Sequence, residues 1–172
     1  GVAGLDMEYR NGIDVMTTET ACWSSIWCTD DKTREYYELH GRPEGYRKME
    51  PQEIAYYDGL VYVDLSDIKP VIAMPFHPSN VYTIEELKAN AADIMNEVQK
   101  EGMKLFGGNT RLDLVSKVRN GEVYTDQGVI AGCSGGTYGN ITAAADILSG
   151  RSTGNGPFSL SVYPASQPVF MQ

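Results

Sequence analysis

The chain has 172 residues, of which 42% are hydrophobic, and a formal net charge of −9. This length and apolar content can bury a core for one domain or for parts of two, which excludes a disordered tail. The negative charge and the scattered lysines and arginines exclude nucleic acid as an expected partner, because phosphate backbones would be repelled.

Membrane and disulfide signals are also lacking in the sequence. No stretch reaches the roughly 20 apolar residues of a membrane helix, and the first residues show no basic region followed by an apolar one. Three cysteines, Cys22, Cys28 and Cys133, are an odd number for a disulfide scaffold. We therefore expect a cytoplasmic protein without a membrane partner. Cys22 and Cys28 are interpreted as buried thiols, because zinc sites favour closer spacings.

The first 65 residues predict alternating short elements. Residues 1–27 indicate strand and loop, and residues 29–40 predict a helix, with Thr29 as its cap and Gly41 beyond its end. Residues 50–53 predict a short helix, and the turn at residues 58–59 leads into a predicted strand at residues 60–65. The aromatic residues of this part are interpreted as core or interdomain packing: Trp23, Trp27, Tyr56 and Tyr57.

Prolines then mark a connection, and a well-patterned helix follows it. The prolines between residues 70 and 78 predict an extended segment, and we place a domain junction near residues 70–82. His77, between two prolines, is interpreted as a turn histidine. A capping-box pattern at residues 83–86 predicts a helix that closes at Gly102. Its core face consists of Leu87, Ala91, Ile94, Met95 and Val98. Residues 112–118 predict a further helix that ends at residues 120–121.

The last third predicts a strand, a glycine-rich turn, a helix and a second strand. These elements cover residues 128–131, 132–136, 138–148 and 158–162. Together they predict one β-α-β unit with parallel strands and a right-handed crossover.

The turn Gly132-Cys133-Ser134-Gly135-Gly136 has the clearest chemical potential. A turn from a parallel strand into a helix presents free backbone amides and the positive end of the helix dipole. This setting favours the thiolate of Cys133, the form that binds metal or attacks an electrophile. The glycines leave room for a bulky group near the backbone.

Several interpretations of this turn compete. A passive cysteine in a tight turn is one, and a cysteine nucleophile with a distant histidine base is another. The turn differs from the nucleophile loop of trypsin-like proteases because Cys133 replaces aspartate and no suitable histidine motif is present. The glycine spacing does not match a dinucleotide-binding fingerprint, and the lysine of a phosphate-binding loop is absent.

Four blocks in order resemble the aconitase family, and more narrowly its bacterial hydratase members. They are Asn11-Gly12-Ile13-Asp14-Val15 with residues 17–20, residues 57–58 with 63–70, Pro75-Phe76-His77-Pro78, and Ala131-Gly132-Cys133-Ser134 with Tyr138. The resemblance spans nearly the whole chain and is weakest between residues 84 and 126. It implies an α/β fold, a three-layer α/β/α arrangement with a mainly parallel sheet. Residues 1–80 would end one such domain, and residues 81–172 would start the next.

The resemblance also implies a site. Cys133 falls on the first of three cysteines that hold a [4Fe–4S] cluster in the family, in which one iron stays open to substrate. Ser134 and Gly135 stand where the family has threonine and asparagine beside that cysteine, so the hydrogen bonds around the ligand differ. Asp14 falls where the family has an active-site glutamate, and its shorter carboxylate could still exchange protons.

These matches predict an internal piece of a longer hydro-lyase that dehydrates and rehydrates a small hydroxy-carboxylic acid. The piece would depend on the rest of its chain for the other cluster cysteines, so no cluster and no activity are expected of it alone. The departures at Asp14, Ser134 and Gly135 leave a second hypothesis open: a non-catalytic α/β binding or scaffold domain of an aconitase-like protein.

Overall fold

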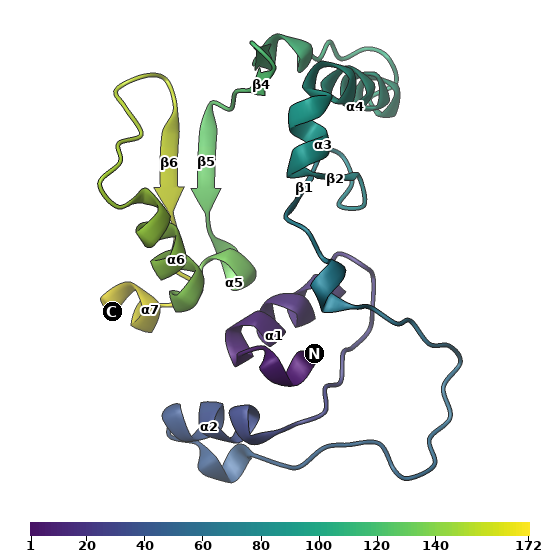
Figure 1. Ribbon diagram of the computed structural model, residues 1–172, viewed down its shortest axis with the longest axis vertical. Coiled ribbons are helices and arrows are strands. Elements are labelled where there is room, and N and C mark those ends of the chain that lie inside the picture. Colours follow the sequence, from purple (N-terminus) through teal and green to yellow (C-terminus); the bar gives the residue numbers. More distant parts are fainter. The chain divides into compact units, whose positions relative to one another are not determined.

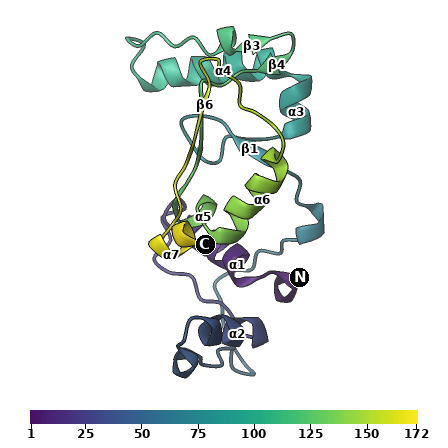
Figure 2. The same cartoon turned by 90° about the vertical axis from the view of Figure 1, so that its left-hand side faces the viewer.

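A computed structural model describes all residues from Gly1 to Gln172, and Figures 1 and 2 show its short helices and small sheets. The chain forms two compact units. The first unit comprises Gly1–Leu65, Val129–Ser152 and Leu160–Gln172, and the second comprises Ser66–Gly128 and Thr153–Ser159. None of the helices combines the length and the apolar composition that crossing a membrane requires.

The first unit opens on helices, so the prediction of strand and loop is wrong for residues 2–17, whereas residues 18–27 contain no helix or strand and agree with the predicted loop. A 3-10 turn, Val2–Gly4, precedes helix α1 (Met7–Asp14), and a second 3-10 turn, Val15–Thr17, follows it. The Asp6 carboxylate accepts a hydrogen bond from the Tyr9 amide at 2.8 Å and so caps α1.

Helix α2 (Asp31–Leu39) confirms the helix predicted for residues 29–40. Its cap is Asp30, one residue later than predicted, and Asp30 and Thr33 form a capping box. Gly41, at φ +65°, ends the helix in the left-handed conformation that glycine adopts without strain.

Residues 46–64 contain no helix or strand, and Figure 1 shows them as one long ribbon without either after α2. A 3-10 turn, Pro43–Gly45, precedes this stretch, and another, Leu65–Asp67, follows it. The predicted helix at residues 50–53 and the predicted strand at residues 60–65 are therefore both wrong. Tyr56, Tyr57 and Trp23 are exposed, so their assignment to packing is wrong as well, whereas Trp27 is half-buried.

The second unit contains a hairpin that leads into the best-predicted helices. Strands β1 (Val71–Ala73) and β2 (Val81–Thr83) pair antiparallel, and Val71 lies opposite Thr83. Helix α3 (Ile84–Ala89) starts at the predicted capping box of Thr83 and Glu86. The chain breaks the helix at Asn90 and continues as α4 (Ala91–Leu105), where one helix was predicted.

The predicted core face of these helices is confirmed. All five residues are buried, and Val98 is only 1% exposed: Leu87, Ala91, Ile94, Met95 and Val98. Met74, from the segment after β1, joins this core.

Residues 112–118 do not form the predicted helix. A 3-10 turn, Val115–Lys117, runs into strand β3 (Val118–Arg119), which pairs with β4 (Glu122–Val123). Asn120 and Gly121 have φ values of +54° and +79°. Two left-handed residues in succession match the short turn of a β-hairpin, so this pair turns a hairpin and does not end a helix.

The predicted β-α-β pattern is confirmed in its elements and in the parallel direction of its strands. Strand β5 (Gln127–Ile130), the one-turn helix α5 (Gly132–Gly135), helix α6 (Tyr138–Leu148) and strand β6 (Ser159–Val162) follow in order. The Ser159 amide donates to the Asp126 carbonyl and the Tyr163 amide to the Ile130 carbonyl, at a constant offset along both strands, as parallel pairing requires. Helix α7 (Gln167–Met171) follows β6.

Helices and small sheets agree with the predicted α/β class. Each of the three sheets has two strands, and two of the sheets are antiparallel. The predicted three-layer arrangement with a mainly parallel sheet is therefore not seen within this chain and stays a prediction for a longer protein.

Candidate functional site

The turn with Cys133 lies where the sequence predicts it, between strand β5 and a helix start. Ala131 is extended, Gly132 has a φ of +86°, and Cys133 is the second residue of the single helical turn α5. The Cys133 side chain is exposed. The thiol is therefore available to a group outside this chain.

The backbone around the turn combines one crowded glycine with two open ones. Gly136 is buried, and a β-carbon at this position would lie 2.6 Å from the Tyr163 carbonyl oxygen and 2.9 Å from the Ala165 nitrogen. The Ala165 amide donates a hydrogen bond of 2.7 Å to the Gly136 carbonyl, which fixes the end of the turn to the chain after β6. β-Carbons at Gly132 and Gly135 would meet nothing within 4 Å. The side of the turn that carries Cys133 therefore has space for a bulky ligand.

Helix α1 packs against this turn within the first unit. The Gly139 amide donates a hydrogen bond of 2.7 Å to Glu8 Oε2 across 131 residues of sequence. A β-carbon at Gly12 would lie 3.7 Å from the Ser134 hydroxyl. A cleft of about 490 Å³ lies between α1 and the start of α6, and Ser134 and Gly139 line it. The Glu8 carboxylate thus binds the start of α6, just after the turn, and sequence reasoning missed it because no local pattern reveals a contact over such a separation.

Asn140 is a second residue that sequence reasoning missed. Its side-chain amide donates hydrogen bonds to the Ser134 carbonyl and, at 3.1 Å, to the Thr137 hydroxyl. These bonds tie the turn to the first turn of α6. Ser134 is therefore held through its backbone, and Gly135 is left in open space.

Asp14, the predicted catalytic carboxylate, lies on a different side of α1. Its Oδ1 accepts a hydrogen bond of 3.2 Å from Trp27 Nε1, which also donates to the Ser25 hydroxyl at 2.8 Å. Asp14 lines a cleft of about 160 Å³ together with Trp27 and Cys28. The structure thus brings Ser134 and α1 together, but it places Asp14 and Ser134 in separate clefts.

A partly buried ion pair fixes α1 against α2 beside the Asp14 cleft. The Arg10 guanidinium is 3% exposed and donates two hydrogen bonds to the Asp30 carboxylate, at 3.0 and 2.7 Å. Its Nε donates to the Leu5 carbonyl at 3.2 Å. The hydrogen bonds from Arg10 lower the pKa of Asp30 from its ordinary 3.8 to about 2. This two-point pair fixes the direction of α1, which carries both Glu8 and Asp14.

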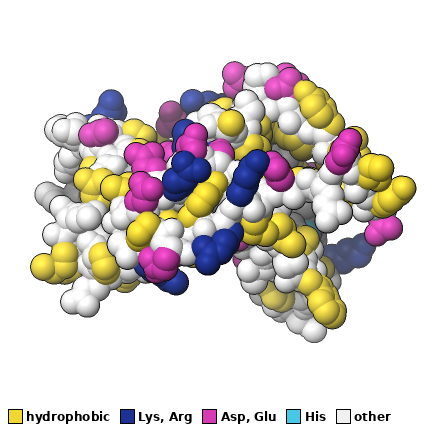
Figure 3. Space-filling model, turned by 90° about the horizontal axis from the view of Figure 1, so that it is seen from below, with side chains coloured by type: hydrophobic (Ala, Val, Ile, Leu, Met, Phe, Trp, Pro, Cys, Tyr) yellow, Lys and Arg dark blue, Asp and Glu magenta, His cyan; other side chains and the backbone are white.

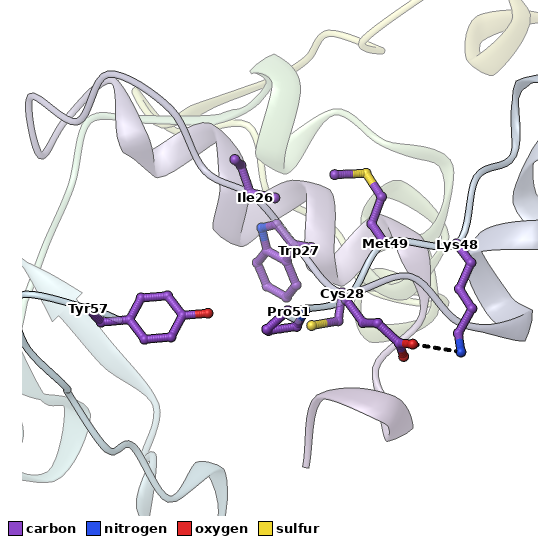
Figure 4. Close-up of a pocket in the computed structure, with 8 residues that line it drawn as sticks. Ile26, Trp27, Cys28, Lys48, Met49, Pro51 and Tyr57 are labelled. Atoms are coloured by element: carbon purple, nitrogen blue, oxygen red, sulfur yellow. Dashed lines mark ion pairs between the residues drawn. The ribbon is translucent and has the colours of Figure 1, made fainter. Parts of the chain in front are cut away.

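A further cleft of the first unit, of about 610 Å³, contains none of the predicted site residues. Figure 4 shows the Cys28 thiol and the Tyr57 hydroxyl extending toward Pro51. Lys48 Nζ lies 2.9 Å from a carboxylate oxygen of Glu50 and forms an ion pair with it. That carboxylate raises the pKa of Lys48. Cys22 and Cys28 are both exposed, so the prediction that they are buried is wrong.

The two histidines do not join any of these sites. His77 Nδ1 accepts a hydrogen bond from the Ser79 amide, which agrees with its interpretation as a turn histidine. His40 Nδ1 lies 2.8 Å from the Tyr36 carbonyl at the end of α2. No three His, Cys, Asp or Glu side chains lie close enough together to hold a metal ion. Cys133 is therefore a single donor within this chain.

The relatives found by comparison with known proteins share one description. Relatives include large subunits of 3-isopropylmalate dehydratase from Clostridium kluyveri (30% identical), Lachnoclostridium phytofermentans (28%) and Clostridium beijerinckii (28%). Each alignment covers 172 residues, which is 100% of this chain and 32–33% of the relative. The chain thus spans about a third of the length of the curated relatives it matches.

The sequence model of the Aconitase family (aconitate hydratase) matches residues 1–172, which includes every block that carried the resemblance. The chain belongs to the aconitase family.

Proposed function

We propose that this chain is part of a longer hydro-lyase, and that Cys133 supplies one of the ligands to a [4Fe–4S] cluster in it. The observation that carries the proposal is the exposed Cys133 side chain on a fixed turn with open space at Gly132 and Gly135. Such a cluster, when bound, supplies an iron with an open position that acts as a Lewis acid. One thiolate is a fitting donor for it, and the remaining ligands would come from outside this chain.

The residues around the turn would orient the ligand and the substrate. Asn140 and the backbone at Gly136 hold the turn, and Glu8 fixes α1 beside it. Ser134 and Gly135 would line the space next to the ligand cysteine, where the hydroxyl of Ser134 can donate a hydrogen bond to an anionic group.

We assign Asp14 a role in holding or moving a proton in the longer protein. Its carboxylate, which accepts from Trp27 Nε1, lines its own cleft. Contact with the substrate would therefore need groups that other parts of the protein supply. A carboxylate at this position is a group that can accept or donate a proton.

The substrate class that we propose is a small hydroxy-carboxylic acid. The names of the relatives make 3-isopropylmalate the first compound to test, and their designation as large subunits makes a smaller second subunit the first partner to test. We place the protein in the cytoplasm, since its three cysteines are free thiols. In the full chain, residues 1–80 and 81–172 would belong to successive three-layer α/β domains.

The test is dehydratase activity in the longer protein, prepared without oxygen and loaded with iron and sulfide. Cys133→Ala should abolish the activity, and Cys22→Ala, which removes another exposed thiol, should leave it unchanged. A wild-type protein that carries the cluster but acts on no hydroxy acid would favour the non-catalytic binding domain.

Asp14→Asn tests the carboxylate separately from its hydrogen bond, because the asparagine oxygen can still accept from Trp27. A general acid or base contributes roughly 10²–10⁴-fold, so the turnover should fall by that amount and its pH profile should lose one limb. Unchanged turnover would remove Asp14 from the mechanism.

A further inference from the structure

The glycine-rich turn is held at one end by backbone and at the other by a side chain. Gly136 is buried, and its carbonyl accepts the 2.7 Å hydrogen bond from the Ala165 amide. A β-carbon at Gly135 would meet nothing within 4 Å, so the surroundings do not restrict this residue on that side. Glycine also has more backbone freedom than any other residue. The orientation of Cys133 therefore depends on what holds its direct neighbour, Ser134.

Apolar packing contributes little to holding this turn. No hydrophobic side chain of the first unit is buried, since all six buried hydrophobic residues of the chain belong to the second unit. Figure 3 likewise shows hydrophobic side chains reaching the surface between charged ones. Hydrogen bonds and close backbone contacts therefore determine how the turn is oriented.

The Asn140 side chain holds Ser134 from the first turn of α6. Its amide nitrogen, Nδ2, donates to the Ser134 carbonyl and, at 3.1 Å, to the Thr137 hydroxyl. A carbonyl oxygen can only accept a hydrogen bond, so the group that faces Ser134 must be the NH₂ of Asn140 and not its oxygen. A side chain that caps a helix start instead accepts from backbone amides. Asn140 thus acts as a donor toward the turn.

The backbone that carries Asn140 is fixed as well. The neighbouring Gly139 amide donates a hydrogen bond of 2.7 Å to Glu8 Oε2, and Glu8 belongs to helix α1. A side chain can hold a functional group in place only when its own position is determined by further contacts. A series of hydrogen bonds therefore leads from α1 through the start of α6 to the residue next to Cys133.

We propose that Asn140 is a positioning residue for the Cys133 ligand, because it holds the Ser134 carbonyl and so sets the direction in which the thiolate faces a bound cluster. This inference rests on the proposed function, since it concerns the cluster that Cys133 would bind. Removing a group that orients a metal ligand commonly lowers metal affinity or activity by about 10- to 100-fold. The loss of Asn140 should therefore affect retention of the cluster more than stability of the fold.

Asn140→Leu in the longer protein tests this inference. Leucine is similar in size to asparagine and has a higher helix propensity, so α6 should form while the bond to Ser134 is lost. After loading with iron and sulfide, Asn140→Leu should release iron to a chelator about 10- to 100-fold faster than the wild type. The electron paramagnetic resonance signal of the reduced cluster should also change, because the geometry of one ligand differs.

Thr142→Val is the matched control on the same helix. It removes a hydroxyl that donates to the Tyr138 and Gly139 carbonyls within α6 and does not contact the turn. Thr142→Val should release iron at the wild-type rate, and both variants should unfold at temperatures close to that of the wild type. Release from Asn140→Leu at the wild-type rate, or equally fast release from both variants, would overturn the inference.

A measurement without the cluster separates this inference from the proposed function. The Gly136 amide donates to the Gly132 carbonyl at 2.8 Å and so reports on the single turn α5. In Asn140→Leu this amide should exchange with deuterium about 3- to 10-fold faster than in the wild type. Equal exchange in the two proteins would overturn the inference even if the cluster binds. A wild type that binds no cluster would overturn the proposed function, and the Gly136 amide would still decide whether Asn140 orients the turn.

Discussion

The two units of this chain differ in the contacts that stabilise each of them internally. The second unit has an apolar core, built on α3 and α4 and continued by Met74. The first unit relies on polar ties and close backbone fits: Arg10 with Asp30, Glu8 with the Gly139 amide, and Gly136 against the chain after β6. The first unit, which contains the candidate site, is therefore also the unit that buries little apolar surface.

The largest effect is expected from a variant that disturbs the close backbone contact of Gly136 with the chain after β6. Gly136→Ala places a β-carbon within 2.6 Å of the Tyr163 carbonyl oxygen, and backbone cannot move aside as a flexible side chain can. We expect a loss of about 3 kcal/mol in the free energy of unfolding. Gly135→Ala, at the preceding position and in open space, should change the free energy of unfolding by less than about 0.5 kcal/mol. Equal effects of the two variants in thermal unfolding would contradict the described turn.

The second unit should respond to loss of core volume. Val98→Ala removes two buried methyl groups and should cost about 2 kcal/mol. Ile54→Ala, an exposed position in the first unit, is the matched control and should cost little. Chemical denaturation that shows similar midpoints for the two variants would indicate that the apolar core does not stabilise the second unit.

Acid should weaken the first unit selectively. The pKa of Asp30 is lowered in the folded state, so the unfolded state binds more protons between about pH 4 and pH 2. Stability from the pair with Arg10 is therefore fully present above about pH 4 and is lost as the pH falls toward 2. Both tryptophans belong to the first unit, so their fluorescence can follow this loss.

Asp30→Asn separates this charge effect from capping, because asparagine can still cap α2. We expect a cost of about 1–2 kcal/mol at pH 7, reduced by the partial exposure of Asp30, and a flatter acid transition. Asp31→Asn, in an exposed pair with Arg34, should leave the transition as it is. An acid transition that Asp30→Asn does not alter would contradict the role of the pair.

The smallest effect concerns the tie between α1 and α6. Glu8→Gln exchanges a charged acceptor for a neutral one near a helix N-terminus and should cost about 1 kcal/mol or less. Faster hydrogen exchange of the Gly139 amide is the direct measurement. Glu38→Gln, on α2, should leave this amide unaffected.

The sequence predicted most where structure depends on local pattern. The face of α3 and α4, the cap at Thr83 and the order strand, turn and helix around Cys133 are all as predicted, because periodicity and turn chemistry determine them within a few residues. The helix break at Asn90 escaped prediction because the apolar spacing continues across it.

The sequence predicted least where structure depends on distant partners. The strand expected at residues 60–65 is not formed in this chain, and the contact of Glu8 with Gly139 joins residues 131 positions apart. The sequence therefore predicted the turn with Cys133, Ser134 and Gly135. It could not predict that Asp14 lies in a different cleft from Ser134, because sequence spacing does not determine which side chains meet in space.

Iron content and visible absorbance of the longer protein test the central claim most directly. After loading with iron and sulfide without oxygen, the wild type and Cys28→Ser should show the broad absorbance of an iron–sulfur cluster, whereas Cys133→Ser should lose it along with bound iron. The same absorbance and iron content in Cys133→Ser as in the wild type would contradict the assignment of Cys133 as a ligand.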